Sequence, residues 1–247
     1  MSSERHYRAQ SAIDLQQHTL TVGETDLALL LPPGLWNDAV AAGLRVYLIE
    51  RRRSLQALIM AFPEFAASHQ PVAVPADAPP LARSMAEAAQ LAGVGPMAAV
   101  AGCFAELAGR YLLRQTASHE VIVENGGDIF VMSRRQRVVG VFCGEDSPFH
   151  QRLAVRLAPG QMPCGVCTSS GTVGPSFSYG KADAALIIAG SAVLADAAAT
   201  AAGNMVQSKE DVQMACDRAM TIPGVRAALI VCQDRLAAAG EIELVSI

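Results

Sequence analysis

Apolar residues recur along the chain with two different periods, and these separate predicted strands from predicted helices. Over residues 1–31 apolar and polar positions alternate in two stretches that end at the break 32–34, which is typical of a β-hairpin. From Trp36 to Met60 the apolar positions recur at steps of three and four, which predicts an amphipathic helix. The proline-rich stretch 69–80 then predicts a loop.

The same criteria predict the remaining elements. Helices are expected over Ala82–Leu91, Met97–Thr116, Ser191–Val206 and Asp211–Met220. Strands are expected on both sides of a glycine turn within Glu120–Ser133, and over Arg137–Cys143, Leu153–Leu157, Ala184–Ala189, Val225–Val231 and Ile242–Ile247. Because strands occur both in hairpins and beside helices, the order favours an α+β fold. We expect largely antiparallel sheets with packed helices, in a single compact unit over residues 1–247.

Composition narrows the classes of protein that the chain can represent. Half of it is hydrophobic (51%) and 17% is charged, which excludes a disordered protein. No apolar run reaches the roughly 18 to 20 residues of a membrane span, and the N-terminus has no signal core, so we expect a cytoplasmic protein with no membrane partner. Six cysteines in a chain of this size are expected to be free thiols. The Ala-rich composition is compatible with a homo-oligomer.

Charge argues against one class of partner. The net charge is -4, without a basic stripe interleaved with aromatic residues, so no nucleic acid partner is expected. The densest positive spot is Arg51-Arg52-Arg53. It is either a solvated helix face or a contact for an anion.

Residues 164–180 are rich in hydroxyl groups and glycine and predict a loop. Backbone N–H groups and hydroxyls without bulky side chains bind phosphate or carboxylate oxygens. The residues that offer them are Thr168, Ser169, Ser170, Gly171 and Thr172. Lys181 follows and would neutralise anionic charge, although its distance from the glycines is not that of a P-loop. An ordinary Ser/Thr/Gly turn is the alternative.

Asp196 and Thr200 lie four residues apart in a predicted alanine-rich helix. This spacing puts both side chains on one side of the helix. A carboxylate and a hydroxyl so placed can share Mg²⁺, which takes oxygen ligands and keeps waters or ligand phosphates. A hydrogen-bonded polar pair inside the helix is the alternative.

The stretch Glu124-Asn125-Gly126-Gly127-Asp128 predicts a tight turn between two strands. Two glycines permit positive φ angles and close approach of a ligand to the backbone. Carboxylates flank them on both sides. The turn is therefore either purely structural or one wall of a ligand site.

Cys164 and Cys167 form a lone CxxC motif. One such pair cannot complete a tetrahedral zinc site. Buried, unreactive thiols are expected, and Cys167 is the more interesting of the two because it leads directly into the predicted ligand loop. The histidines form no hydrolase triad with a serine or cysteine at recognisable spacing.

Six motifs in this order resemble one known family over nearly the whole chain, the UPF0280 (DUF375) family. They are ETDL (24–27), GVGPMAAVAG (93–102), VIVENGGDIF (121–130), GVCTSSGTVG (165–174), SFSYGKADA (176–184) and LADAAATAAGN (194–204). That family in turn is similar to the ApbE superfamily, whose better-known members are FAD:protein FMN transferases.

The resemblance implies a chemistry. Flavin transferases bind FAD with Mg²⁺ and attach FMN to a Thr or Ser of a target protein. Their GGD turn matches Gly126-Gly127-Asp128 and their TSG loop matches 168–171. Their ADxxAT helix, which carries the metal-binding Asp and Thr, matches Asp196 and Thr200. The chain departs from them at 93–102, where their glycine-rich segment has a lysine and an acidic residue, and at 174–180, where they have a DPRTG-like segment.

Two functional hypotheses follow. In the first, the protein is a Mg²⁺-dependent transferase or related hydrolase acting on a flavin- or nucleotide-like diphosphate. Asp196 and Thr200 hold the metal, and Asp128 is the candidate base. In the second, the protein has kept the fold without transfer chemistry, and it binds a ligand or handles sulfur through the thiol of Cys167. That second role requires a lowered thiol pKa.

Overall fold

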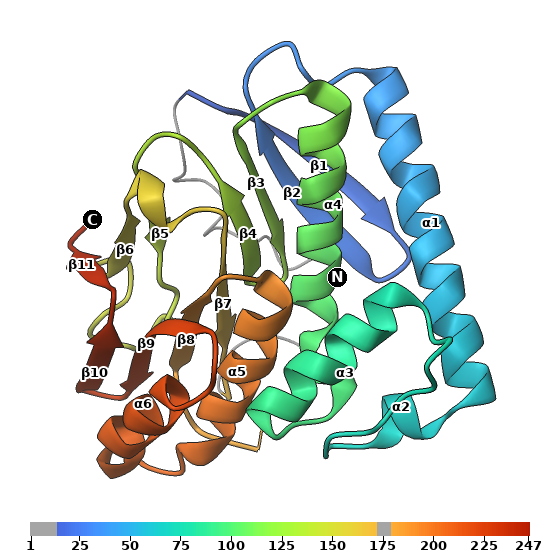
Figure 1. The fold of residues 1–247 in the computed structure, drawn as a ribbon. Helices are drawn as coiled ribbons and strands as arrows, with labels where there is room; N and C mark the ends of the chain where they lie inside the picture. The colour runs from blue at the N-terminus through green and yellow to red at the C-terminus, as the bar shows by residue number, and fades with distance from the viewer. Residues whose placement is uncertain (1–13, 172–178) are drawn as a thin grey trace.

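The computed structural model describes residues 14–171 and 179–247, and an antiparallel sheet of eight strands runs through it (Figure 1). The strands lie in the order β1-β2-β3-β4-β7-β8-β9-β10, and every neighbouring pair is antiparallel. Their bounds are β1 (Gln16–Val22), β2 (Thr25–Leu31), β3 (Val121–Asn125), β4 (Asp128–Met132), β7 (Cys164–Ser169), β8 (Ala184–Ala189), β9 (Val225–Cys232) and β10 (Arg235–Gly240).

Helices cover one face of this sheet and a small second sheet covers part of the other (Figure 1). The helices are α1 (Asp38–Ala61), α2 (Glu64–Ala67), α3 (Pro80–Ala92), α4 (Val100–Thr116), α5 (Ala192–Met205) and α6 (Val212–Met220). Short 3-10 turns are η2 (Pro96–Ala99), η3 (Pro159–Gln161) and η4 (Lys209–Asp211). The second sheet has the order β11-β6-β5, with β5 (Arg137–Gly140), β6 (Ala154–Leu157) and β11 (Glu243–Val245).

The central strands are buried on both faces. Along β8, Ala185 and Ile187 belong to the core under the helices, whereas Leu186 and Ile188 belong to the core under the small sheet. Successive side chains of a strand point to opposite faces, so a strand covered on both sides must be apolar at every position. This is why Ala184–Ala189 has no polar residue, and why the sequence pattern identified it as a strand.

The structure confirms the predicted α+β class and the antiparallel sheet with packed helices, and it corrects three elements. Cys164–Ser169, predicted as part of a loop, is strand β7 in the middle of the sheet. Arg235–Gly240 forms an edge strand that the sequence pattern did not indicate, because three of its six residues are alanines, which have weak strand propensity. The helix predicted from Met97 begins as the 3-10 turn η2 and becomes α-helical only at Val100.

Among the described helices, no single one has both the length and the hydropathy to cross a membrane. The helical segments Pro80–Ala92 and Pro96–Thr116 have the required length and hydropathy only when they are taken together, and the chain bends by 104° between them.

Candidate functional site

Two glycines bring α5 into close contact with both α4 and β7. A Cβ atom on Gly102 would lie 2.2 Å from the carbonyl oxygen of Ala192, and one on Gly165 would lie 2.3 Å from the Ala192 Cα. Glu106 of α4 fixes the start of α5, because its Oε2 accepts hydrogen bonds from Ala192 N at 2.7 Å and from Ser191 Oγ at 2.9 Å. These contacts fix the position of α5 along its axis relative to α4. They thereby determine which side chains of α5 contact the first turn of α4.

Asp196 points from α5 at that first turn. Its Oδ2 accepts the Gly102 N–H at 2.8 Å, and the Ala101 N–H also donates to this carboxyl. Ala99, at the N-cap position of α4, has no side chain that could accept these donors. Asp196 therefore satisfies the free N–H groups of a neighbouring helix. Thr200 lies one turn further along the same side of α5 and is half-buried.

Asp128 and Asp196 form a buried carboxyl pair. Burial raises the pKa of Asp128 to about 7, with a further rise from the charge of Glu124, although hydrogen bonds from the Cys167 thiol and the Thr168 N–H act in the opposite direction. Burial and the nearby Asp128 charge raise the pKa of Asp196 well above its usual range. Among the described residues, no lysine or arginine is one of the groups that set these two pKa values.

Such a pair holds a proton at neutral pH unless a cation replaces it, because two buried like charges repel. Within residues 14–171 and 179–247, no three His, Cys, Asp or Glu side chains are arranged to hold a metal ion. The side chains therefore do not form a complete protein cage. Mg²⁺ does not need one, because it commonly binds through one or two carboxylates and takes its other oxygens from water and ligand phosphates.

The hairpin turn places Asp128 at the start of β4. Gly126 and Gly127 have φ angles of +70° and +106°, the positive values that a two-residue turn of this kind requires. Asn125 and Asp128 are cross-strand partners on either side of the turn. Glu124 was predicted to bind ligand, but it is buried and its Oε1 accepts the Gly127 N–H at 2.7 Å, so it supports the turn.

The predicted phosphate loop is largely strand where the structure describes it. Thr168 and Ser169 pair with β8, and the Thr168 N–H is directed at Asp128. Ser170 is half-buried, and the Gly171 N–H is bonded to the carbonyl of Ala182 at 2.9 Å. In the part of the loop that the structure describes, these groups pair β7 with β8 and contact Asp128 and Ala182. Thr172 lies outside the described residues.

Lys181 does not join the carboxyl pair. The main-chain N–H of Lys181 donates to the main-chain carbonyl of Val206 at 2.7 Å. This places Lys181 just beyond the C-terminal end of α5. Asp196 lies ten residues earlier, about 15 Å along the helix axis. The charge-neutralising role predicted for Lys181 next to the metal ligands therefore has no support in the geometry.

All six cysteines are free and buried, as the sequence predicted. The Cys167 Sγ lies 3.4 Å from the carbonyl oxygen of Ala192, so this carbonyl and the Asp128 carboxyl are alternative acceptors of its single proton. Burial and the charges of Asp128 and Asp196 raise the pKa of Cys167 well above its usual value. A reactive thiol needs the opposite shift. This environment argues against the hypothesis in which Cys167 carries the chemistry.

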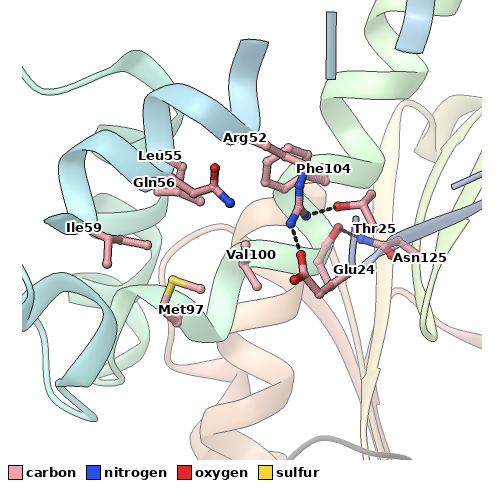
Figure 2. A pocket seen from close by; sticks show the side chains of 11 residues that line it. Glu24, Thr25, Arg52, Leu55, Gln56, Ile59, Met97, Val100, Phe104 and Asn125 are labelled. Atoms are coloured by element: carbon pink, nitrogen blue, oxygen red, sulfur yellow. Dashed lines mark hydrogen bonds and ion pairs between the residues drawn. The ribbon is translucent and has the colours of Figure 1, made fainter. Parts of the chain in front are cut away.

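A cavity of about 370 Å³ lies beside the carboxyl pair, between α1, the β1–β2 turn and the start of α4 (Figure 2). Its apolar wall comes from Leu55 and Ile59 of α1, Met97 of η2, and Val100 and Phe104 of α4. Its polar lining comes from Glu24, Thr25, Arg52, Gln56 and Asn125. Ligand pockets commonly combine an apolar wall with a few polar groups in this way.

The cavity and the carboxyl pair share two residues. Ala101 lines the cavity, and its N–H bonds to Asp196. Asn125 also lines the cavity, and it is the cross-strand partner of Asp128. The Asn125 Nδ2 donates to the Ala101 carbonyl at 3.0 Å, which joins the two walls. A single ligand could thus place one part in the cavity and another against the carboxyl pair.

A second hollow, of about 580 Å³, is lined by acidic residues that include Glu145, Asp146, Asp183 and Asp234. Four carboxylates with no basic residue among the lining would repel a phosphate-bearing ligand. The cavity beside Asp196 is therefore the better candidate site.

Arg52 and Glu106 are site residues that sequence reasoning did not single out. The sequence placed Arg52 only within a positive cluster, for which a solvated helix face and an anion contact were the alternatives. In the structure the Arg52 side chain lines the cavity, whereas the side chain of the next residue, Arg53, is exposed to solvent. The signal for Glu106 was a lone carboxylate in an otherwise small and apolar stretch of helix.

A family model described as AbpE bacteria matches residues 8–243. UPF0280 proteins are similar over most of the chain. The one from Methanosarcina acetivorans is 41% identical over 195 residues, covering 78% of this chain and 74% of the relative. The Methanocella arvoryzae protein is 42% identical over 191 residues, covering 77% of each chain. The Methanosarcina barkeri protein is 34% identical over 233 residues, and the alignment covers 94% of this chain and 87% of the relative.

Solved structures with a similar fold include flavin transferases. A mutant of the flavin transferase ApbE from Vibrio cholerae aligns with a TM-score of 0.53 at 10% identity, covering 92% of this chain and 97% of that one. The flavinyl transferase ApbE from Pseudomonas stutzeri, in its apo form, aligns with a TM-score of 0.53 at 12% identity. This alignment covers 94% of this chain and 95% of the transferase chain. At these identities the likeness is one of fold.

Proposed function

Because the chain belongs to the UPF0280 family and has the fold of the ApbE flavin transferases, we propose that it is a Mg²⁺-dependent enzyme that binds a flavin dinucleotide and transfers its FMN part. The observation that carries this proposal is the buried carboxyl pair, whose pKa values no lysine or arginine of the described residues sets, next to a cavity large enough for a ring system. Asn125 and Ala101 belong to both.

The residues divide the task between them. Asp196 and Thr200 would hold the metal, with Asp128 beside them. Bound Mg²⁺ would neutralise charge on the diphosphate. The ring part would occupy the apolar cavity, held between α1 and α4.

Asp128 is the candidate base. In the transfer, a phosphorus–oxygen bond forms to the acceptor hydroxyl as the bond to AMP breaks, and Asp128 takes the hydroxyl proton. Without metal the pKa of Asp128 is raised to about 7; bound Mg²⁺ would lower this pKa and keep the carboxylate ionised, the form that accepts a proton.

The first test compares FAD binding by calorimetry, with and without Mg²⁺, in the wild type and in Asp196→Asn. We expect Mg²⁺ to strengthen wild-type binding, and the substitution to remove that dependence and weaken binding at least about tenfold, roughly 1.4 kcal/mol. An asparagine oxygen can still accept the Gly102 N–H, so the fold should persist. Asp77→Asn, at an exposed loop position, is the matched control and should bind as the wild type does.

The outcome separates binding from transfer. Equal Mg²⁺-dependent binding by wild type and Asp196→Asn would refute the metal assignment. Release of AMP from FAD in the presence of an acceptor protein, measured chromatographically, would support transfer. Tight binding of FAD without AMP release under any condition would favour a ligand-binding protein that lacks the transfer step.

A further inference from the structure

Arg52 reaches from α1 across the edge of the cavity to the β1–β2 turn (Figure 2). Its Nη1 donates to Thr25 Oγ1 at 2.7 Å, and its Nη2 is paired with the Glu24 carboxylate. Gly23 leaves room for this contact, since a Cβ there would lie 2.8 Å from Nη2. The ETDL motif at residues 24–27 therefore supplies both partners that hold Arg52 at the cavity.

The two members of the ion pair differ in their exposure to solvent. The Arg52 side chain is 18% exposed, whereas the Glu24 side chain is 87% exposed. Glu24 can turn into water at little cost to itself, because its carboxylate is already exposed, but the largely buried Arg52 then needs another acceptor in its place. Arg52 cannot leave as easily, because Thr25 still holds it against the cavity. Water competes for the exposed Glu24 end of the pair, so an acceptor group of a ligand can displace Glu24 from Arg52.

Of the eleven described residues that line the cavity, Arg52 is the one basic residue and Glu24 the one acidic residue. A guanidinium donates hydrogen bonds and accepts none. Once Glu24 turns away, the group that replaces it must present oxygen or nitrogen acceptors. Apolar side chains also line this cavity, and Leu55 and Phe104 among them are buried.

We infer that Arg52 is a specificity-determining residue that binds the carbonyl edge of the ligand's ring, with Glu24 as its exchangeable counter-ion. The inference rests on the proposed function and names what the cavity selects. The ligand it fits is a planar fused ring with one apolar edge and one edge bearing carbonyl oxygens, as in a flavin. An adenine ring has no carbonyl oxygen, and its nitrogen acceptors lie next to a donor amino group, so it fits the forked guanidinium less well.

The test measures what the ring adds to binding. Calorimetry with Mg²⁺ compares FAD with ADP-ribose, which shares the diphosphate and adenosine but has no flavin. In the wild type FAD should bind more tightly than ADP-ribose. Arg52→Gln should weaken FAD binding about 10- to 100-fold, the range for a hydrogen bond to a charged group, while ADP-ribose affinity changes less than about twofold. Arg53→Gln, one exposed position along, is the matched control.

Two further variants keep the inference falsifiable. Glu24→Gln removes the competing carboxylate and should tighten FAD binding a few fold. Arg52→Lys keeps the charge but loses the planar fork, and should give an intermediate FAD affinity if Arg52→Gln proves unstable in thermal unfolding.

The outcomes distinguish this inference from the function on which it rests. Mg²⁺-dependent FAD binding that is unchanged in Arg52→Gln, or weakened equally for FAD and ADP-ribose, overturns the role of Arg52 alone. A loss of FAD affinity in Glu24→Gln as large as that in Arg52→Gln also overturns it. A wild type that binds no FAD with Mg²⁺ overturns the proposed function and the inference together.

Discussion

Asp196 has two roles that a single carboxylate can combine. One oxygen satisfies the N–H groups at the start of α4, and the group as a whole lies beside Asp128 with no basic partner among the residues that set its pKa. The first role explains how a buried acid is tolerated. The second explains why a cation would be bound strongly there, since it would relieve the repulsion between the two carboxyls.

The thiols should be nearly inert in the native protein. Burial raises the pKa of Cys103 and Cys143 to about 12 and those of Cys164 and Cys216 to about 11. We expect alkylation at neutral pH to be slower than that of a free thiol by on the order of 100-fold or more, because reaction requires opening of the structure. Mass spectrometry of labelled native protein, with denatured protein as control, measures this. Fast labelling of Cys167 would restore the thiol hypothesis.

At the scale of elements, the site depends on how closely α5 approaches α4 and β7. Gly102 and Gly165 both lie against Ala192, one from each neighbour. The helix pattern predicted α4 and α5 individually. The pattern did not predict that the two helices contact each other at Gly102 and Ala192. Such a close approach depends on which residues of each helix face each other after folding.

Gly102→Ala tests this contact. The new methyl would lie 2.2 Å from the Ala192 carbonyl oxygen and 2.8 Å from the Asp196 Cβ, so α5 must shift. We expect a loss of about 1–3 kcal/mol in the free energy of unfolding, typical of overpacking, together with weaker Mg²⁺-dependent FAD binding. Urea denaturation and calorimetry measure the two effects.

Gly160→Ala is the matched control for that substitution. A Cβ at Gly160 has no atom within 4 Å, so its free energy of unfolding should change by less than about 0.5 kcal/mol. Equal stability and equal ligand binding in the two variants would contradict the packing argument.

Strands β7 and β10 show where element-level prediction failed. The residues of β7 are small and include a glycine, a composition typical of loops. They form a strand because β4 and β8 pair with them on both sides and Gly165 leaves room for α5. Pairing with β4 and β8 outweighed local propensity in β7, and hairpin pairing with the preceding strand β9 outweighed it in β10.

At the scale of the whole molecule, the carboxyl pair should make stability depend on pH in an unusual direction. A carboxyl whose pKa is raised on folding binds more protons in the native state than in the unfolded state. The stability that it contributes is therefore present at low pH and is lost as pH rises. For Asp128 the window runs from its usual value of 3.8 to about 7.

We accordingly expect the metal-free wild type to have a higher Tm at about pH 5 than at about pH 8, and the difference to shrink in Asp196→Asn. Thermal unfolding in EDTA measures it. Asp14, whose pKa is lowered chiefly by its hydrogen bond to Arg137, has the opposite effect, but only below the usual Asp range. A Tm that is flat or rises between these two pH values, with the same profile in Asp196→Asn, would contradict the assignment.

The sequence by itself determined most of the elements, the antiparallel α+β class, the family motifs and the free state of the thiols. These follow from local periodicity, turn residues and composition, which act over a few neighbouring positions. Only the tertiary structure decided that Asp196 meets Gly102, 94 residues away, that Thr168 and Ser169 join the sheet, and that Arg52 lines the cavity next to Glu24. Those outcomes depend on how helices pack on the sheet and which strands pair, and no local pattern specifies either.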